Sequence, residues 1–150
     1  MQVLTVQSLH AYIMALIYKE YILNETAIET ISAELQEYLN KRKTERRNVQ
    51  RIRLTAEELL LNIMDRFGTG TQISIGIGKQ FGQQFFRLRY ETPPYDPTCD
   101  SISPWSNDLM LSLGLFPSWS YRGKVNTVSL KLADRPKHGT RQSRILCKVC

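Results

Sequence analysis

Cysteine, histidine and long apolar runs are scarce in this chain of 150 residues. Three cysteines cannot form a complete set of disulfide bridges, which favours a reducing cytoplasm over a secreted setting. The longest apolar run, Ala11–Tyr18, is much shorter than the roughly 20 residues that a membrane-spanning helix needs. The first residues also lack the basic segment of a signal peptide. We therefore expect a cytoplasmic protein without membrane insertion.

The scarcity of histidine and cysteine also restricts the available catalytic and metal chemistry. With only His10 and His138 available, a Ser–His–Asp or Cys–His nucleophilic set is not a credible interpretation. Cys147 and Cys150 have the spacing of a metal knuckle, but zinc takes about four ligands and His138 is the only further candidate nearby. Two interpretations stay open: free thiols in a polar tail, or half of a site that a second chain completes.

Positive charge is in moderate excess, with 20 Lys and Arg against 14 Asp and Glu and a net charge of +6. Part of this excess lies in the segment Lys41–Arg53, which we expect to be an exposed helix end and the turn after it. The segment lacks the interleaved aromatic residues of a nucleic-acid-binding surface. Nucleic acid is therefore an unlikely partner, and any binding should be weak and strongly salt-dependent.

Helical periodicity dominates the first half of the chain. We expect a first helix from Leu9 toward Leu23. A second helix should begin at the capping box Thr26–Glu29 and run into the basic segment. A third is predicted over Leu54–Phe67, starting with the capping box Thr55–Glu58. Each of these helices carries an apolar face that must be covered by another layer of the fold.

Strand periodicity follows in the second half. Apolar residues alternate with polar ones or glycine in Ile73–Ile77, Phe85–Tyr90 and Asn126–Leu132. Long helices followed by strands predict an α+β two-layer sandwich, with helices packed on one face of a mixed, mainly antiparallel sheet. We divide the chain into an N-terminal extension (1–24), a sandwich domain (25–133) and a basic tail (134–150).

The predicted helix Leu54–Phe67 carries polar residues opposite its apolar face. Glu58, Asn62 and Asp65 are spaced so that an acid, an amide and an acid lie in line. One interpretation is that Glu58 completes a capping box and that Asn62 is simply exposed. The other is that Glu58 and Asn62 form a functional site.

Three motifs resemble those of one family of ATPases and occur in the same order along the chain. The helix motif Glu58-Leu59-Leu60-Leu61-Asn62 resembles the N-box of the GHKL (histidine-kinase-like) ATPases, and especially that of the bacterial anti-sigma-factor serine kinases. Residues 93–97 resemble the Pro-Pro-Phe-Asp-Pro stretch that follows the adenine-binding acid of that branch, and residues 121–128 resemble the segment entering its last strand. The order and spacing agree over roughly residues 25–133.

The resemblance implies roles for named residues. Asn62 would hold the Mg²⁺ that bridges the ATP phosphates, and Glu58 would be the general base. The matched segments also place Asp65, Asp96 and Thr127 among the positions expected to bind nucleotide. ATP and Mg²⁺ are thus the cofactors that the resemblance suggests.

Two of the segments that bind nucleotide in that family depart from the family pattern in this sequence. The adenine-binding Asp falls on Tyr90, and the nearest acid, Glu91, is displaced by one residue. The second glycine box reads Ser106-Asn107-Asp108, so that Asp108 would bring negative charge toward the phosphates. These changes predict weakened or lost ATP binding.

The sequence therefore leads to two expected functions. The first is a cytoplasmic regulatory or protein-binding module on an ATPase fold, with a regulator or a sigma-factor-like target as its protein partner. The alternative is an active Mg-ATP-dependent protein serine kinase or ATPase that uses Glu58 and Asn62. The apolar segment Leu9–Leu23 could cover a partner surface, and a homodimer is one of the assemblies that it allows.

Overall fold

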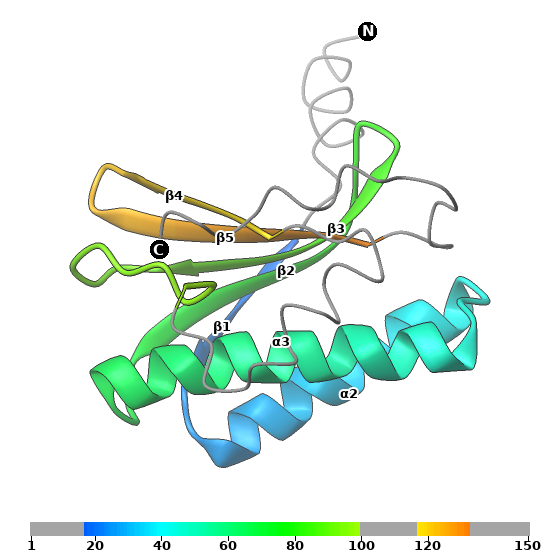
Figure 1. Cartoon of the computed structure of the whole chain (residues 1–150), viewed down its shortest axis with the longest axis horizontal. Coiled ribbons are helices and arrows are strands. Elements are labelled where there is room, and N and C mark those ends of the chain that lie inside the picture. The colour runs from blue at the N-terminus through cyan, green and yellow to red at the C-terminus, as the bar shows by residue number, and fades with distance from the viewer. Residues whose placement is uncertain (1–16, 100–116, 133–150) are drawn as a thin grey trace, which may run out of the picture.

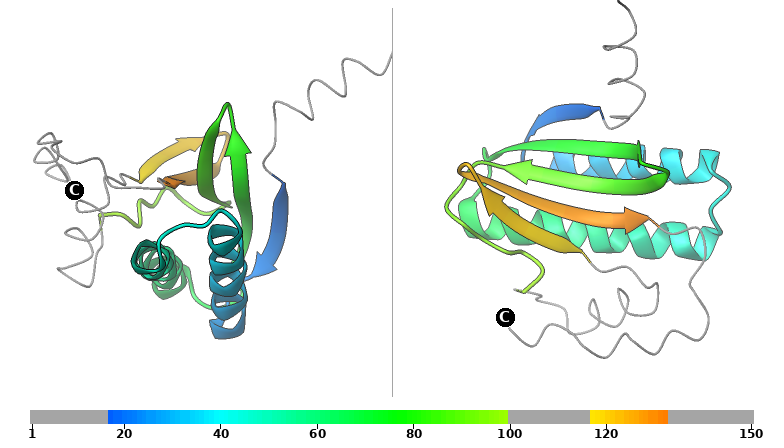
Figure 2. Two further views of the ribbon diagram at one scale, coloured as in Figure 1. Left: turned by 90° about the vertical axis from the view of Figure 1, so that its right-hand side faces the viewer. Right: turned by 90° about the horizontal axis from the view of Figure 1, so that it is seen from above.

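The fold consists of two helices packed against a five-stranded sheet. A computed structural model of the chain describes residues 17–99 and 117–132. Its elements, in chain order, are β1 (Tyr18–Ile22), α2 (Glu25–Lys41), α3 (Arg46–Phe67), β2 (Gln72–Gln80), β3 (Gln83–Tyr90), β4 (Ser118–Arg122) and β5 (Val125–Leu132). Both helices lie on the same side of the sheet (Figures 1 and 2). The predicted α+β two-layer architecture is confirmed.

The sheet has the strand order β1-β2-β3-β5-β4. Every pairing between the described strands is antiparallel. We expected a mixed, mainly antiparallel sheet, and in this part of the chain the sheet is antiparallel throughout. The three predicted strands correspond to β2, β3 and β5, which are neighbours at the centre of the sheet. Alternation of period two was therefore a reliable signal where one face of a strand is buried.

The N-terminal edge strand β1 was not predicted. The expected helix through Leu23 is wrong over Tyr18–Ile22, which pair with β2 from Gly76 to Gln72. The aromatic ring of Tyr18 lies over Gly76, where a Cβ atom would come within 2.9 Å of the ring. Leu23 is fully buried, and its backbone N–H donates to the carbonyl of Thr71 at 2.8 Å. Tertiary pairing has overridden the helical pattern of this short segment.

The starts of both helices differ from the predicted capping boxes. α2 is capped by Asn24, whose side-chain oxygen accepts from the backbone N–H of Ala27 at 2.7 Å. α3 begins at Arg46, so Thr55 lies in the interior of this helix and its hydroxyl donates to the carbonyl of Arg51 at 2.9 Å. Neither predicted box forms an N-terminus. The basic segment accordingly covers the end of α2, the turn and the first turns of α3.

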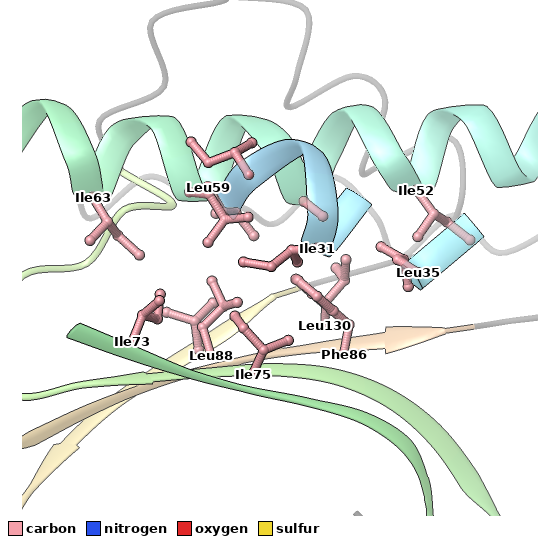
Figure 3. Close-up of a cluster of buried hydrophobic side chains, with 14 of the residues drawn as sticks. Ile31, Leu35, Ile52, Leu59, Ile63, Ile73, Ile75, Phe86, Leu88 and Leu130 are labelled. Atoms are coloured by element: carbon pink, nitrogen blue, oxygen red, sulfur yellow. The ribbon is translucent and has the colours of Figure 1, made fainter. Parts of the chain in front are cut away.

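One apolar core fills the space between the layers (Figure 3). It is built from α2, α3 and the inward-facing residues of the central strands, among them Ile31, Leu35, Ile52, Leu59, Ile63, Ile73, Ile75, Phe86, Leu88 and Leu130. Phe67 at the end of α3 packs against this core and is partly buried. The expected packing of Leu59, Ile63 and Phe67 on one face of the sheet is confirmed. The core fixes α3 across the sheet and thereby positions the polar residues near its C-terminal end.

Candidate functional site

Polar residues of α3, β3 and β5 meet at one end of the sandwich. Asn62 lies near the end of α3, Tyr90 ends β3, and Asn126 is the register partner of Tyr90 at the start of β5. All three side chains are buried, with exposed fractions of 3%, 1% and 0% respectively. The expectation that Asn62 points away from the core is therefore wrong. On the helix, Asn62 borders Leu59 and Ile63 and turns inward with them.

The side chain of Asn62 is held by the loop that follows β3. Its amide nitrogen donates to the carbonyl oxygen of Pro97 at 3.1 Å. Its side-chain oxygen is buried and has no hydrogen-bond partner among the residues that the structure describes. The hydroxyl of Tyr95 also reaches the backbone carbonyl of Asn62 at 3.5 Å.

Tyr90 is tied to the same loop. Its hydroxyl donates to the carbonyl oxygen of Tyr95 at 2.7 Å. Burial, with smaller contributions from Asp96 and Tyr95, raises the pKa of Tyr90 well above the ordinary value of a phenol. The Tyr90 side chain is thus a neutral hydrogen-bond donor whose proton is already used within the protein.

Asn126 organises the whole loop and was missed by the sequence analysis. Its amide nitrogen lies within 3.0–3.4 Å of four oxygens, those of the Tyr90, Thr92 and Pro93 carbonyls and the Thr92 hydroxyl. Its side-chain oxygen accepts from the backbone N–H of Tyr95 at 3.0 Å and from the indole N–H of Trp119 at 3.1 Å. One feature of the sequence could have identified it. Asn126 lies on the same face of its strand as the apolar Val128, Leu130 and Leu132, so it is a polar side chain at a position expected to be buried.

The ring of Tyr95 anchors the loop against α3. Tyr95 is 8% exposed and meets the ring of Phe67 edge-to-face at a centroid distance of 5.5 Å. The guanidinium of Arg66 lies 5.3 Å from the centroid of the same ring. We call residues 92–98 the closure loop, because through Tyr95 and Pro97 it joins α3 to the ends of β3 and β5.

The remaining predicted site residues are not gathered in one place. Glu58 is half-buried one turn before Asn62, whereas Asp65 and Glu91 are exposed. Asp96 lies in the closure loop, where its carboxylate accepts from the backbone N–H and hydroxyl of Thr98 at 3.0 and 2.6 Å. Thr127 points to the sheet face opposite the helices, because it alternates with the buried Asn126 and Val128. Asp108, Cys147 and Cys150 lie outside the described residues.

A cavity of about 780 Å³ opens beside the end of β3. Its described lining comes from β1, β2, β3, the turn before β2, Phe67 at the end of α3, the first residues of the closure loop and Val125 of β5, and it includes Tyr90 and Glu91. Neither Glu58 nor Asn62 is among those lining residues. Asn62, the expected magnesium ligand, is therefore not part of the described lining of this cavity.

The first part of the basic segment is exposed, as expected, whereas Arg51 and Arg53 in α3 are half-buried. The five cations Lys41, Arg42, Lys43, Arg46 and Arg47 are all solvent-exposed at the α2–α3 turn. The guanidinium of Arg42 lies over the ring of Tyr38 at 5.1 Å. In residues 17–99 and 117–132, no cluster of three His, Cys, Asp or Glu side chains could hold a metal ion, and no helix is long and apolar enough to cross a bilayer.

Comparison with known proteins supports the fold alone. No protein-family model and no curated protein matches the chain. Among solved structures, a chain in the crystal structure of the SiaB-SiaC complex from Pseudomonas aeruginosa matches with a TM-score of 0.50 and 11% sequence identity. The match covers 87% of this chain and 97% of that chain. Membership of the GHKL family stays a prediction.

Proposed function

We propose that this chain is a regulatory, protein-binding module built on a histidine-kinase-like ATPase fold whose nucleotide site is closed. The proposal combines the three motifs of the sequence with the two-layer fold that carries them. One observation carries it: the closure loop is hydrogen-bonded to two of the residues at which the resemblance expects nucleotide contacts. Pro97 accepts from Asn62, and Tyr95 accepts from Tyr90.

Loss of the adenine-binding acid supports this interpretation. A buried carboxylate that accepts from an adenine amino group forms a charge-assisted hydrogen bond worth roughly 1.5–3 kcal/mol. Tyr90 is a longer, neutral side chain whose hydroxyl proton already binds the carbonyl of Tyr95. The missing bond alone would weaken ATP binding by about tenfold to a hundredfold. Opening the closure loop would cost further hydrogen bonds.

A protein is the expected partner of such a module. The structural neighbour named above was crystallised as a complex of two proteins, SiaB and SiaC. By analogy of fold, the partner of this chain would be a cytoplasmic regulator or a sigma-factor-like target.

A second candidate, an active Mg-ATP-dependent protein serine kinase, rests on the side-chain oxygen of Asn62. This oxygen is buried and lacks a hydrogen-bond partner among the described residues, which fits a ligand position for a hard cation. Glu58 lies one turn earlier on the same helix and would act there as general base. When bound, Mg²⁺ would neutralise phosphate charge in this candidate.

ATP turnover separates the two candidates. The full chain and the variant Glu58→Gln would be incubated with Mg-ATP, and phosphate release and protein phosphorylation would be measured. We expect both proteins to show the same background, because the proposed module has no catalytic base in use. Turnover by the wild type that falls by about a hundredfold or more in Glu58→Gln would contradict the proposal and support the kinase.

A further inference from the structure

The two edges of the sheet are protected to different degrees. A free edge strand exposes unpaired backbone groups, and soluble proteins usually guard it with charged residues, proline or bulges. β1 carries Lys19 and Glu20 in its centre. β4 reads Ser-Trp-Ser-Tyr-Arg, with no charge before its last residue, Arg122, and the adjacent proline, Pro117, lies before the strand and not within it. Among the described residues, no strand pairs with the outer edge of β4, which lies opposite β1 in the sheet (Figure 2).

The sequence of β4 is compatible with antiparallel pairing to itself. Pairing about a two-fold axis at Ser120 would place Ser120 opposite Ser120 of the second copy and Ser118 opposite its Arg122. Trp119 would lie opposite Tyr121 of the second copy. No like charges meet in this register, and two aromatic cross-strand pairs form, a favourable combination on a sheet face.

The side chains of β4 are also placed for such a contact. Ser118, Ser120 and Arg122 are exposed, while Trp119 and Tyr121 are half-buried. Trp119 is already fixed, because its indole N–H donates to the side-chain oxygen of Asn126. Pairing would cover the remaining surface of the two aromatic rings without the cost of ordering Trp119.

We propose that β4 is a homodimer interface, in which two copies pair through this edge and form one continuous sheet across a two-fold axis. A second copy is the occupant favoured here, because in this register no like charges meet and Trp119 and Tyr121 form aromatic cross-strand pairs. One strand on each side buries little surface, so the dimer should be weak, with a dissociation constant of about 1–100 µM. The proposal does not depend on nucleotide binding.

Sedimentation equilibrium of the full chain over that concentration range tests the interface. Position 120 faces itself across the axis, so Ser120→Lys and Ser120→Glu should each weaken dimerisation by about tenfold or more through like-charge repulsion. A mixture of the two variants should form a heterodimer of opposite charges. Ser118→Glu, which would face Arg122 of the second copy, should tighten the dimer. Ile22→Lys introduces the same charge in the opposite edge strand β1 and serves as the matched control.

Each outcome decides for or against the interface. A wild type that stays monomeric up to about 100 µM overturns the proposal. A dimer that tolerates Ser120→Lys, or that is broken equally by Ile22→Lys, also overturns it, because the contact would then lie elsewhere. Pairing only with a different protein would appear as a monomeric wild type in this experiment. Thermal unfolding of each variant tests whether a monomeric variant is still folded. Recovery of the dimer in the mixture of Ser120→Lys and Ser120→Glu is expected only if Ser120 lies on the axis.

Discussion

At the scale of single residues, the buried side-chain amide of Asn126 joins three parts of the site. Asn126 bonds to the end of β3, the closure loop and β4, and it is fully buried. In such a network the loss of one member leaves several buried groups without partners. Sequence analysis predicted the strand around Asn126 but not this role, because its partners are more than 30 residues away along the chain except for Trp119.

Replacement of Asn126 by alanine tests this network. We expect Asn126→Ala to lower the free energy of unfolding by about 2–4 kcal/mol, because the Tyr95 N–H and the Trp119 indole N–H lose their acceptor. Urea denaturation measures the change. The matched variant Asn40→Ala alters an exposed asparagine in α2 and should cost less than about 1 kcal/mol. Equal effects of both substitutions would show that Asn126 does not organise the loop.

The environment of Tyr21 predicts that the free energy of unfolding decreases at alkaline pH. Its hydroxyl donates to the Glu34 carboxylate at 2.7 Å, and burial, followed by that contact and the negative charge of Glu34, raises the pKa of Tyr21 to about 12. Because the unfolded chain would release this proton near pH 10, the contribution of Tyr21 is complete below pH 10 and is lost as the pH rises toward about 12.

The variant Tyr21→Phe isolates this contribution. Its stability should fall less steeply than that of the wild type between pH 10 and about 12, as followed by urea denaturation at several pH values. Parallel curves for the two proteins would mean that the Tyr21–Glu34 contact does not shift the titration.

At the scale of elements, strands were easier to predict than helix ends. β2, β3 and β5 are central strands with one buried face, so that their side chains alternate clearly. The edge strands β1 and β4 are short and depend on pairing with a neighbour, which no local pattern records. Helix periodicity identified α2 and α3, but two capping-box patterns misplaced their starts, because such patterns also arise by chance inside helices.

Two substitutions test whether α2 is capped by Asn24, as in the structure, or by the predicted capping box Thr26–Glu29. Asn24→Ala should destabilise the protein by about 1 kcal/mol, because the backbone N–H of Ala27 loses its acceptor. Thr26→Ala, the matched control within the predicted box, should cost less than about 0.5 kcal/mol because Thr26 is exposed and its side chain does not cap α2. Thermal or chemical denaturation compares the two. A larger effect of Thr26→Ala would restore the predicted box as the true cap.

At the scale of the whole molecule, the fold brings Asn62 and Tyr90 to the same end of the core. The closure loop is hydrogen-bonded to both of these side chains. Composition and periodicity were sufficient for the two layers and for the helix that carries Asn62. They could not predict that Tyr95 would pack between that helix and the strand ends, because the contact depends on how a proline-rich loop crosses the core. The inward position of Asn62 has the same origin, since α3 is turned by its packing on the sheet.

Isothermal titration calorimetry of the full chain with Mg-ATP tests the central claim, a closed nucleotide site, most directly. We predict a dissociation constant of about 100 µM or weaker, because Tyr90 lacks the negative charge of the acid that the GHKL resemblance expects there and the closure loop must open. Asn62→Ala should then leave the weak heat signal unchanged, as should the exposed control Asn40→Ala. A dissociation constant of about 1 µM or tighter that is abolished by Asn62→Ala but retained by Asn40→Ala would contradict the account and show a working nucleotide site.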